Sequence, residues 1–192
     1  MSDAISVIKT EHRNLMRVVN IFDIVLRSVD AGHPPDFDLM DAIVEYLRTF
    51  TDQYHHPKED RFLFAALRRR DPDAHAILDE LEAEHGTCYA STTALHDALE
   101  AYKRGESGSA ERFQQVAAEY RRLQLRHLQK EEGVVIPLAR AALTEEDWHT
   151  INAAFADHKD PLFSDDAQES ARQLYSRIVN LTPAPHGFAD PR

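Results

Sequence analysis

The sequence predicts an all-α protein whose main body is an antiparallel up-down four-helix bundle. Apolar residues recur at helical spacing over four long stretches, and short polar connectors separate these stretches. No stretch alternates apolar and polar residues as a half-buried strand would. Consecutive long helices on short connectors pack side by side in alternating directions. We therefore expect one helical bundle with additional short helices after it.

The long helices are expected over residues 5–32, 36–70, 73–104 and 109–143. Prolines, glycines and serines supply the connectors, and Ser2 or Asp3 is suited to cap the first helix. Pro57 lies inside the second stretch and removes one backbone hydrogen bond. The second helix is therefore expected either to kink there or to consist of two shorter helices that meet.

The remaining residues predict a smaller C-terminal part. Thr144–Asp147 resembles a capping box with Asp in place of the usual Glu or Gln, and it opens a short helix. A last amphipathic helix begins at Ser164. The expected division is a bundle over residues 1–143, a helical extension packing on it over 144–181, and a disordered tail over 182–192. The extension is expected either to cover a bundle end or to form a homodimer surface.

Composition limits the classes of partner. The net charge of -11 argues against nucleic acid and against anionic lipid surfaces, which both attract basic proteins. The single cysteine, Cys88, excludes an internal disulfide and favours a reducing compartment. No signal-peptide pattern and no run of about 20 apolar residues is present. We expect a cytoplasmic protein without a nucleic-acid or membrane partner.

The two halves of the chain share a repeated pattern. Both His55–Asp60 and His127–Glu132 read His-x-x-Lys-Glu-acid, and a large apolar trio follows each. Upstream, each half carries a Glu-His pair, ending at His12 in the first half and at His85 in the second. The alignment selects His55 over its neighbour, since His56 matches Leu128. The chain therefore reads as two helical hairpins with equivalent polar positions.

This repeat predicts a metal site. Helical residues four apart lie about 40° apart around the axis and about 6 Å along it, so each His-x-x-x-Glu pair projects from one face. Such polar groups would be costly to bury without partners, and metal coordination satisfies them. Four imidazoles and two carboxylates suit a pair of metals, each with two imidazoles, bridged by Glu59 and Glu131. The predicted ligands are His12, His55, Glu59, His85, His127 and Glu131.

With these residues in this order, the chain resembles the hemerythrin-like, HHE cation-binding family over about residues 5–143. The resemblance implies a four-helix bundle with two Fe ions, bridged by two carboxylates and an oxo or hydroxo group. It further implies binding or sensing of O2, NO or peroxide. Manganese or zinc are the alternative metals. The alternative functions are a di-iron enzyme that detoxifies peroxide or nitric oxide, iron-centre repair, and a helical scaffold with a purely structural metal.

Three comparisons qualify the resemblance. In the oxygen-carrying members the third helix supplies two histidines four residues apart, whereas Tyr89 stands four after His85 here. Tyr89 would leave a coordination position empty, or fill it with water or phenolate, which favours other small-molecule chemistry. Repair members carry a cysteine-bearing N-terminal extension, and this chain begins almost at its first ligand. Ferritin-like bundles need paired Glu-x-x-His motifs, and only Glu82-x-x-His85 matches.

Polar residues beside the ligands have two interpretations. Adjacent helical residues point about 100° apart, so a ligand that Glu11, Glu84 or Glu132 contacts must lie on another helix, and such a contact is the alternative to a solvated position. His56 and Asp60 are expected on the exposed far face, with hydrogen bonds that orient the ligands as the alternative.

The apolar neighbours have simpler expected roles. Phe62 and Leu63 are expected to limit water access to the site. Cys88 is expected to be a thiol buried in the core.

Overall fold

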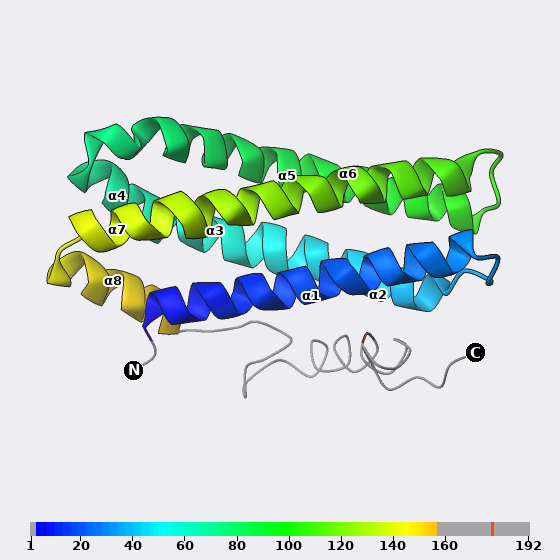
Figure 1. Cartoon of the computed structure of the whole chain (residues 1–192), viewed down its shortest axis with the longest axis horizontal. Coiled ribbons are helices and arrows are strands. Elements are labelled where there is room, and N and C mark those ends of the chain that lie inside the picture. Colours follow the sequence, from blue (N-terminus) through cyan, green and yellow to red (C-terminus); the bar gives the residue numbers. More distant parts are fainter. Residues whose placement is uncertain (1–2, 157–177, 179–192) are drawn as a thin grey trace.

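The computed structural model describes residues 3–156 and residue 178. Within these residues every regular element is helical and no strand occurs. Figure 1 shows long helical runs lying side by side, with a short helix at one end. Of the predicted C-terminal helix only Ile178 is described, and it is buried against the core; the predicted tail lies outside the described residues.

The first helix has the predicted bounds and cap. Helix α1 spans Ala4–Asp30, and the Asp3 side chain accepts a hydrogen bond from the Ile5 N–H. Its end is followed by Gly32 at φ +88°, a conformation that glycine adopts without strain. Asp36 then caps α2 by accepting from the Leu39 N–H at 3.1 Å.

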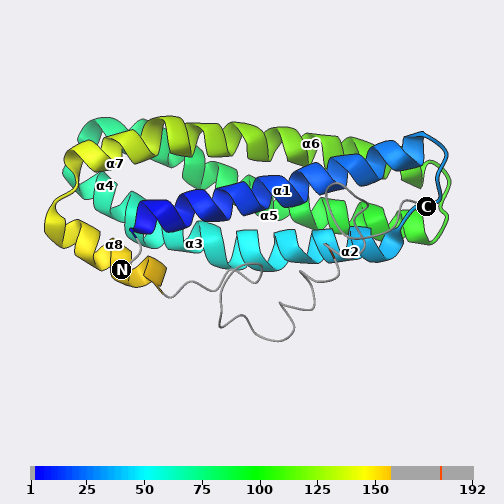
Figure 2. The ribbon, with the colours of Figure 1, turned by 60° about the horizontal axis from the view of Figure 1, so that its bottom comes forward.

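The second run continues past Pro57 and does not divide there. It consists of α2 (Phe37–Tyr46), the π-helical segment η1 (Leu47–His55), α3 (His56–Lys58), the π-helical segment η2 (Glu59–Phe64) and α4 (Ala65–Arg70). Figure 2 shows α2, α3 and α4 following one another along the molecule. The wider π turns on both sides of α3 change the hydrogen-bond spacing where the proline lacks its N–H.

The second half of the chain repeats this organisation. A 3-10 turn, η3 (Pro72–Ala74), leads into α5 (His75–Lys103), and a turn closed by Gly105 and Gly108 leads into α6 (Ser109–Lys130). The π-helical segment η4 (Glu131–Val135) and α7 (Ile136–Ala142) follow. Segment η4 begins at Glu131 as η2 begins at Glu59, so the sequence repeat extends to the backbone.

The hydrophobic core has two parts, with the predicted ligands between them along the chain. The first cluster includes Phe22, Tyr46 and Phe113. The second includes Ile8, Ile151 and Phe155, among other buried side chains. Connections between consecutive long runs lie at alternating ends of the bundle (Figures 1 and 2). This arrangement places equivalent levels of all the runs side by side.

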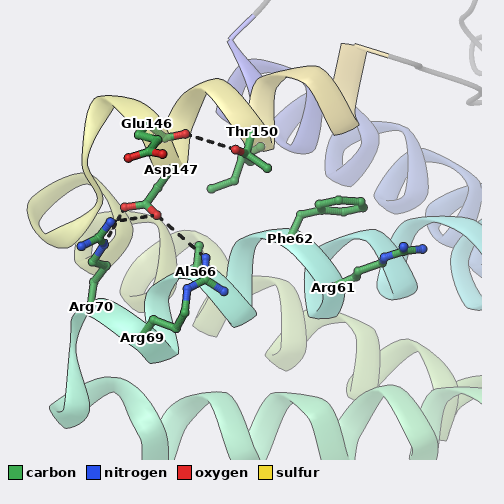
Figure 3. Close-up of a pocket in the computed structure, with 9 residues that line it drawn as sticks. Arg61, Phe62, Ala66, Arg69, Arg70, Glu146, Asp147 and Thr150 are labelled. Carbon is green, nitrogen blue, oxygen red and sulfur yellow. Dashed lines mark hydrogen bonds and ion pairs between the residues drawn. The ribbon is translucent and has the colours of Figure 1, made fainter.

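Helix α8 (Glu145–Ala156) packs on the N-terminal end of α1, where the Ala4 N–H donates to Asn152 Oδ1 at 2.8 Å. The predicted capping box forms: Thr144 Oγ1 lies 2.7 Å from Asp147 Oδ2 and accepts from the Asp147 N–H. Arg70 Nε donates to the same carboxylate at 2.7 Å (Figure 3). The cap and the ion pair together attach α8 to the end of α4.

No helix in the described part of the chain combines the length and apolar character needed to span a bilayer. The longest, α1 and α5, each bury one face and present charged residues on the other. Both are therefore amphipathic helices.

Candidate metal centre

The structure brings all six predicted ligands together in a buried polar layer. They come from every long run: α1, the η1–η2 region, α5, and the junction of α6 with η4. The most exposed of them, His85, retains 7% of its surface. Buried in this way are His12, His55, Glu59, His85, His127 and Glu131.

Their donor atoms form two overlapping groups. His12 and His55 stand with both glutamates in one group, and His85 and His127 stand with the same two glutamates in the other. Within each group the donor atoms lie within 4.8 Å of one another. Glu59 and Glu131 belong to both groups, which is the position that a bridging carboxylate requires.

The separations between donors match a shared cation. In the first group His12 Nε2 lies 3.5 Å from Glu59 Oε1 and 3.4 Å from Glu131 Oε2. In the second, His127 Nε2 lies 3.1 Å from Glu131 Oε1 and 3.1 Å from His85 Nε2. Donors that bind one cation at about 2.1 Å and at right angles stand about 3 Å apart.

Each of the four imidazoles has a carboxylate behind it. A carboxylate only accepts hydrogen bonds, so Nδ1 of each ring carries the proton and Nε2 is left facing the interior. This is the arrangement that orients histidines toward metals in proteins. The pairs are His12 with Glu132 at 3.0 Å, His55 with Glu11 at 2.8 Å, His85 with Asp60 at 2.7 Å, and His127 with Glu84 at 3.1 Å.

These four pairs follow the repeat. Glu11 and Glu84 each precede a histidine ligand and bind a histidine on the next run, while Asp60 and Glu132 each follow a bridging glutamate. All three glutamates do contact a ligand on another helix, which the sequence left as an alternative. Asp60 keeps 37% of its side-chain surface exposed, yet its carboxylate is turned to His85, so the alternative in which it orients a ligand is the one observed.

The pKa values of three side chains in the layer indicate that it favours positive charge. Burial alone would lower the pKa of His12, but the carboxylates of Glu132, Glu59 and Glu131 raise it to about 10. For His85 burial acts in the same direction, and Asp60 and the two bridging glutamates raise the pKa to about 10. Burial raises the pKa of Glu131, yet the surrounding imidazoles hold it well below the ordinary value. The Glu131 carboxylate therefore stays ionised and attracts cations.

The inward atoms fit metal ions. Among the described residues, Nε2 of His12 and His55, Oε2 of Glu59 and both carboxylate oxygens of Glu131 have no hydrogen-bond partner. Buried polar atoms without partners are costly, and charged ones especially so. Two cations between these atoms would satisfy all of them, and a mixed nitrogen and oxygen donor set suits iron, manganese or zinc.

Two neighbouring side chains lie where the sequence did not predict them. Tyr89 is 61% exposed and is therefore not part of the site, because Cys88 and Thr92 take the inward positions on that part of α5. His56 was expected to be exposed, but it is 2% exposed and its ring stacks on His85 at 4.2 Å between centroids. The missed signal was its repeat equivalent Leu128, an apolar residue whose position indicates an inward face.

Aromatic rings enclose the layer. Phe64 stacks on His85 with ring centroids 5.6 Å apart, and the ring of Phe50 lies 6.0 Å from that of His55. Leu63 is buried as expected. Phe62, in contrast, lines a surface pocket of about 470 Å³ against α8, which contains none of the predicted ligands (Figure 3). Cys88 is buried, as expected, in the core.

A family model described as Hemerythrin HHE cation binding domain matches residues 3–139. This range includes all six predicted ligands and the four carboxylates paired with the imidazoles. No curated protein and no solved structure matches the chain.

Proposed function

Because this chain belongs to the hemerythrin HHE cation-binding family, we propose that it is a non-haem di-iron protein that binds or senses O2, NO or a peroxide. The observation that carries the proposal is the pair of buried donor groups that share Glu59 and Glu131. In this proposal residues 1–143 are an antiparallel up-down four-helix bundle, 144–181 an extension packing on it, and 182–192 a tail. We place the protein in the cytoplasm.

The residues of the chain have distinct roles. Nε2 of each of the four histidines would bind a metal, and Glu59 and Glu131 would supply the carboxylates shared between the two metal positions. The paired carboxylates fix each imidazole with its proton on Nδ1. Phe50 and Phe64 keep bulk water from the layer. When bound, the irons supply reversible redox chemistry toward small oxygen- or nitrogen-containing ligands.

The alternatives differ in what supports them. The motive for an enzyme that consumes peroxide or nitric oxide is a coordination position left open at Tyr89, and the exposure of that side chain excludes only its phenolate as the group that fills this position. A scaffold with a purely structural metal predicts that no small ligand changes the site. Binding or sensing is the function we prefer, because the two buried donor groups account for a metal pair, whereas turnover needs a further catalytic group that these residues do not include.

Metal analysis of the purified full-length chain tests the proposal, combined with optical spectra under air and under nitrogen. We expect about two irons per chain and near-ultraviolet absorption that differs between the reduced protein under nitrogen and the same protein in air. Glu131→Ala should lose metal, because both donor groups include this carboxylate. The matched control is Glu145→Ala, on the exposed face of α8. Fewer than one metal per chain in carefully purified protein would refute the proposal.

A further inference from the structure

A fifth buried histidine lies beside the proposed centre and has no role in it so far. His56, in α3, is 2% exposed, and neither ring nitrogen has a hydrogen-bond partner among the described residues. Its ring stacks on His85 at an interplanar angle of 13°, and it lies edge-on to His127 at 5.2 Å between centroids. Burying an imidazole without hydrogen-bond partners costs free energy, and a bound ligand would remove this cost.

The donor atoms of His56 belong to one of the two metal positions. His56, His85 and His127 form a group whose donor atoms lie within 4.8 Å of one another. The group of His12 and His55 has no third imidazole among the described residues. The equivalent position in the second half of the chain is Leu128, which has no donor atom. The two halves of the chain therefore differ at this position. The additional imidazole lies at the metal position of His85 and His127.

A carboxylate also lies behind His56. Oδ1 of Asp52 is 3.8 Å from His56 Nδ1, and both side chains are buried. The hydroxyl of Thr92 donates to the other oxygen of Asp52, which holds this carboxylate in place. The separation exceeds a hydrogen bond, so the imidazole would have to turn toward Asp52 to form one. The arrangement then matches the four carboxylate–histidine pairs, and Nε2 is the nitrogen left for a metal.

We propose that His56 is a third nitrogen ligand of the metal held by His85 and His127, with Asp52 as its positioning residue. The inference rests on the proposed function, since it assigns a further ligand to the same centre. The two metal positions are then unequal, with two imidazoles at one and three at the other. The third imidazole comes from the second helical run, and the exposed Tyr89 of the third run has no part in it.

Titration of the metal-free full-length chain with Co(II) tests the inference, because the visible absorption of Co(II) reports its coordination number. His56→Leu places the residue found at the equivalent position 128 into the first half of the chain. We expect wild type to bind about two Co(II) ions. The variant should bind one of them at least about 10-fold more weakly, with stronger absorption from the lower coordination number. His149→Leu, at an exposed position of α8, should behave as wild type.

A second measurement does not depend on the folding of that variant. In the Co(II)-loaded wild type, each imidazole bound through Nε2 keeps an exchangeable Nδ1 proton with a strongly shifted NMR signal. We expect five such signals, one for each of the five histidines of the layer. Asp52→Asn should keep all five while weakening one site.

The outcomes separate the two proposals. Four shifted signals, or unchanged Co(II) binding in a folded His56→Leu protein, would overturn the role of His56 and leave the di-metal centre intact. Binding of less than one Co(II) by wild type would instead remove the proposed function itself.

Discussion

At the scale of single residues, the carboxylates behind the imidazoles decide how well the layer holds a metal. Glu11 is 1% exposed and accepts from His55 Nδ1 at 2.8 Å, which makes it the most enclosed of the four. Its repeat equivalent Glu84 is more exposed and is shared with Lys130. Loss of the charge at Glu11 should therefore have the larger effect.

We expect Glu11→Gln to weaken metal binding about 10- to 100-fold, since the neutral amide no longer orients and polarises the His55 ring. Competition with a chelator of known affinity measures the change. Glu145→Gln, on the surface of α8, is the matched control. Equal affinities in these two variants would show that the hydrogen bond to His55 does not tune the site.

For Tyr89 we predict no effect on metal binding. Because its side chain is 61% exposed, Tyr89→Ala should leave metal content and optical spectrum as in wild type. Metal analysis of the purified variant checks this. A loss of one metal, or a shifted absorption band, would mean that the phenol turns inward and binds.

The residue scale is also where inference from sequence had mixed success. The repeat identified all six residues that the structure brings together, because identical motifs at matched spacing are informative about shared depth. It failed at Tyr89, because a four-residue spacing leaves about 40° of rotation undecided. It failed at His56, because the alignment did not use the apolar equivalent Leu128 as a sign of an inward position. Only the packing of neighbouring helices determines which flank of a ligand is covered.

At the scale of elements, the sequence located the long helices to within a few residues but not their π-helical segments. Caps, glycines and prolines mark helix ends in the sequence, whereas a π turn differs from an α turn only by one residue per hydrogen-bonded ring. Segments η2 and η4 begin at the two bridging glutamates. Wider turns at these residues change the direction of the side chains that follow, which is consistent with their frequent occurrence at functional sites.

The capping box of α8 should make a measurable contribution to the free energy of unfolding. Thr144→Ala removes the hydroxyl that accepts from the Asp147 N–H and should destabilise the protein by about 1 kcal/mol. Urea denaturation measures the free energy of unfolding. Thr150→Ala is the control on the same helix, because the Thr150 hydroxyl donates a hydrogen bond to the Glu146 carbonyl and caps no helix end. Equal stabilities of the two variants would argue against a capping role.

The ion pair at the same helix predicts a pH dependence. Hydrogen bonds from Arg70 and Thr144 lower the pKa of Asp147 from 3.8 to about 2. A carboxyl whose folded pKa is depressed stabilises the fold above its unfolded pKa, and the stabilisation is lost as pH falls through the folded pKa. The stability difference between wild type and Asp147→Asn should thus be full at about pH 6 and shrink between about pH 5 and pH 2. Denaturation curves at several pH values test this, and a constant difference would contradict it.

At the scale of the whole molecule, the polar layer divides the hydrophobic core into two clusters. Each long run contributes apolar residues to both clusters and a ligand between them. The all-helical class was predictable from periodicity, since each stretch has one apolar face. The division of the core was not, because apolar spacing alone does not reveal which levels face a polar centre.

This division makes the stability of the bundle depend on the metal. Without cations, the ionised Glu131 carboxylate lies buried between the two clusters, and among the cited groups the protonated imidazoles of His12 and His85 offset its charge. Ligands that bind only the folded state stabilise it by about 2.7 kcal/mol per site at 100 times the Kd. For a chain of this size about 1 kcal/mol shifts Tm by roughly 2–4 °C. We expect chelation to lower Tm by about 5–10 °C for each site emptied.

Thermal unfolding of loaded and metal-free protein, followed by circular dichroism, measures this shift. Glu131→Ala supplies the control, because a chain without the shared carboxylate should unfold at the same temperature with and without chelator. Restoring the metal should restore Tm in wild type alone. If the metal-free wild type unfolds at the same temperature as the loaded protein, the polar layer is satisfied without cations, and the metal does not hold the two halves of the core together.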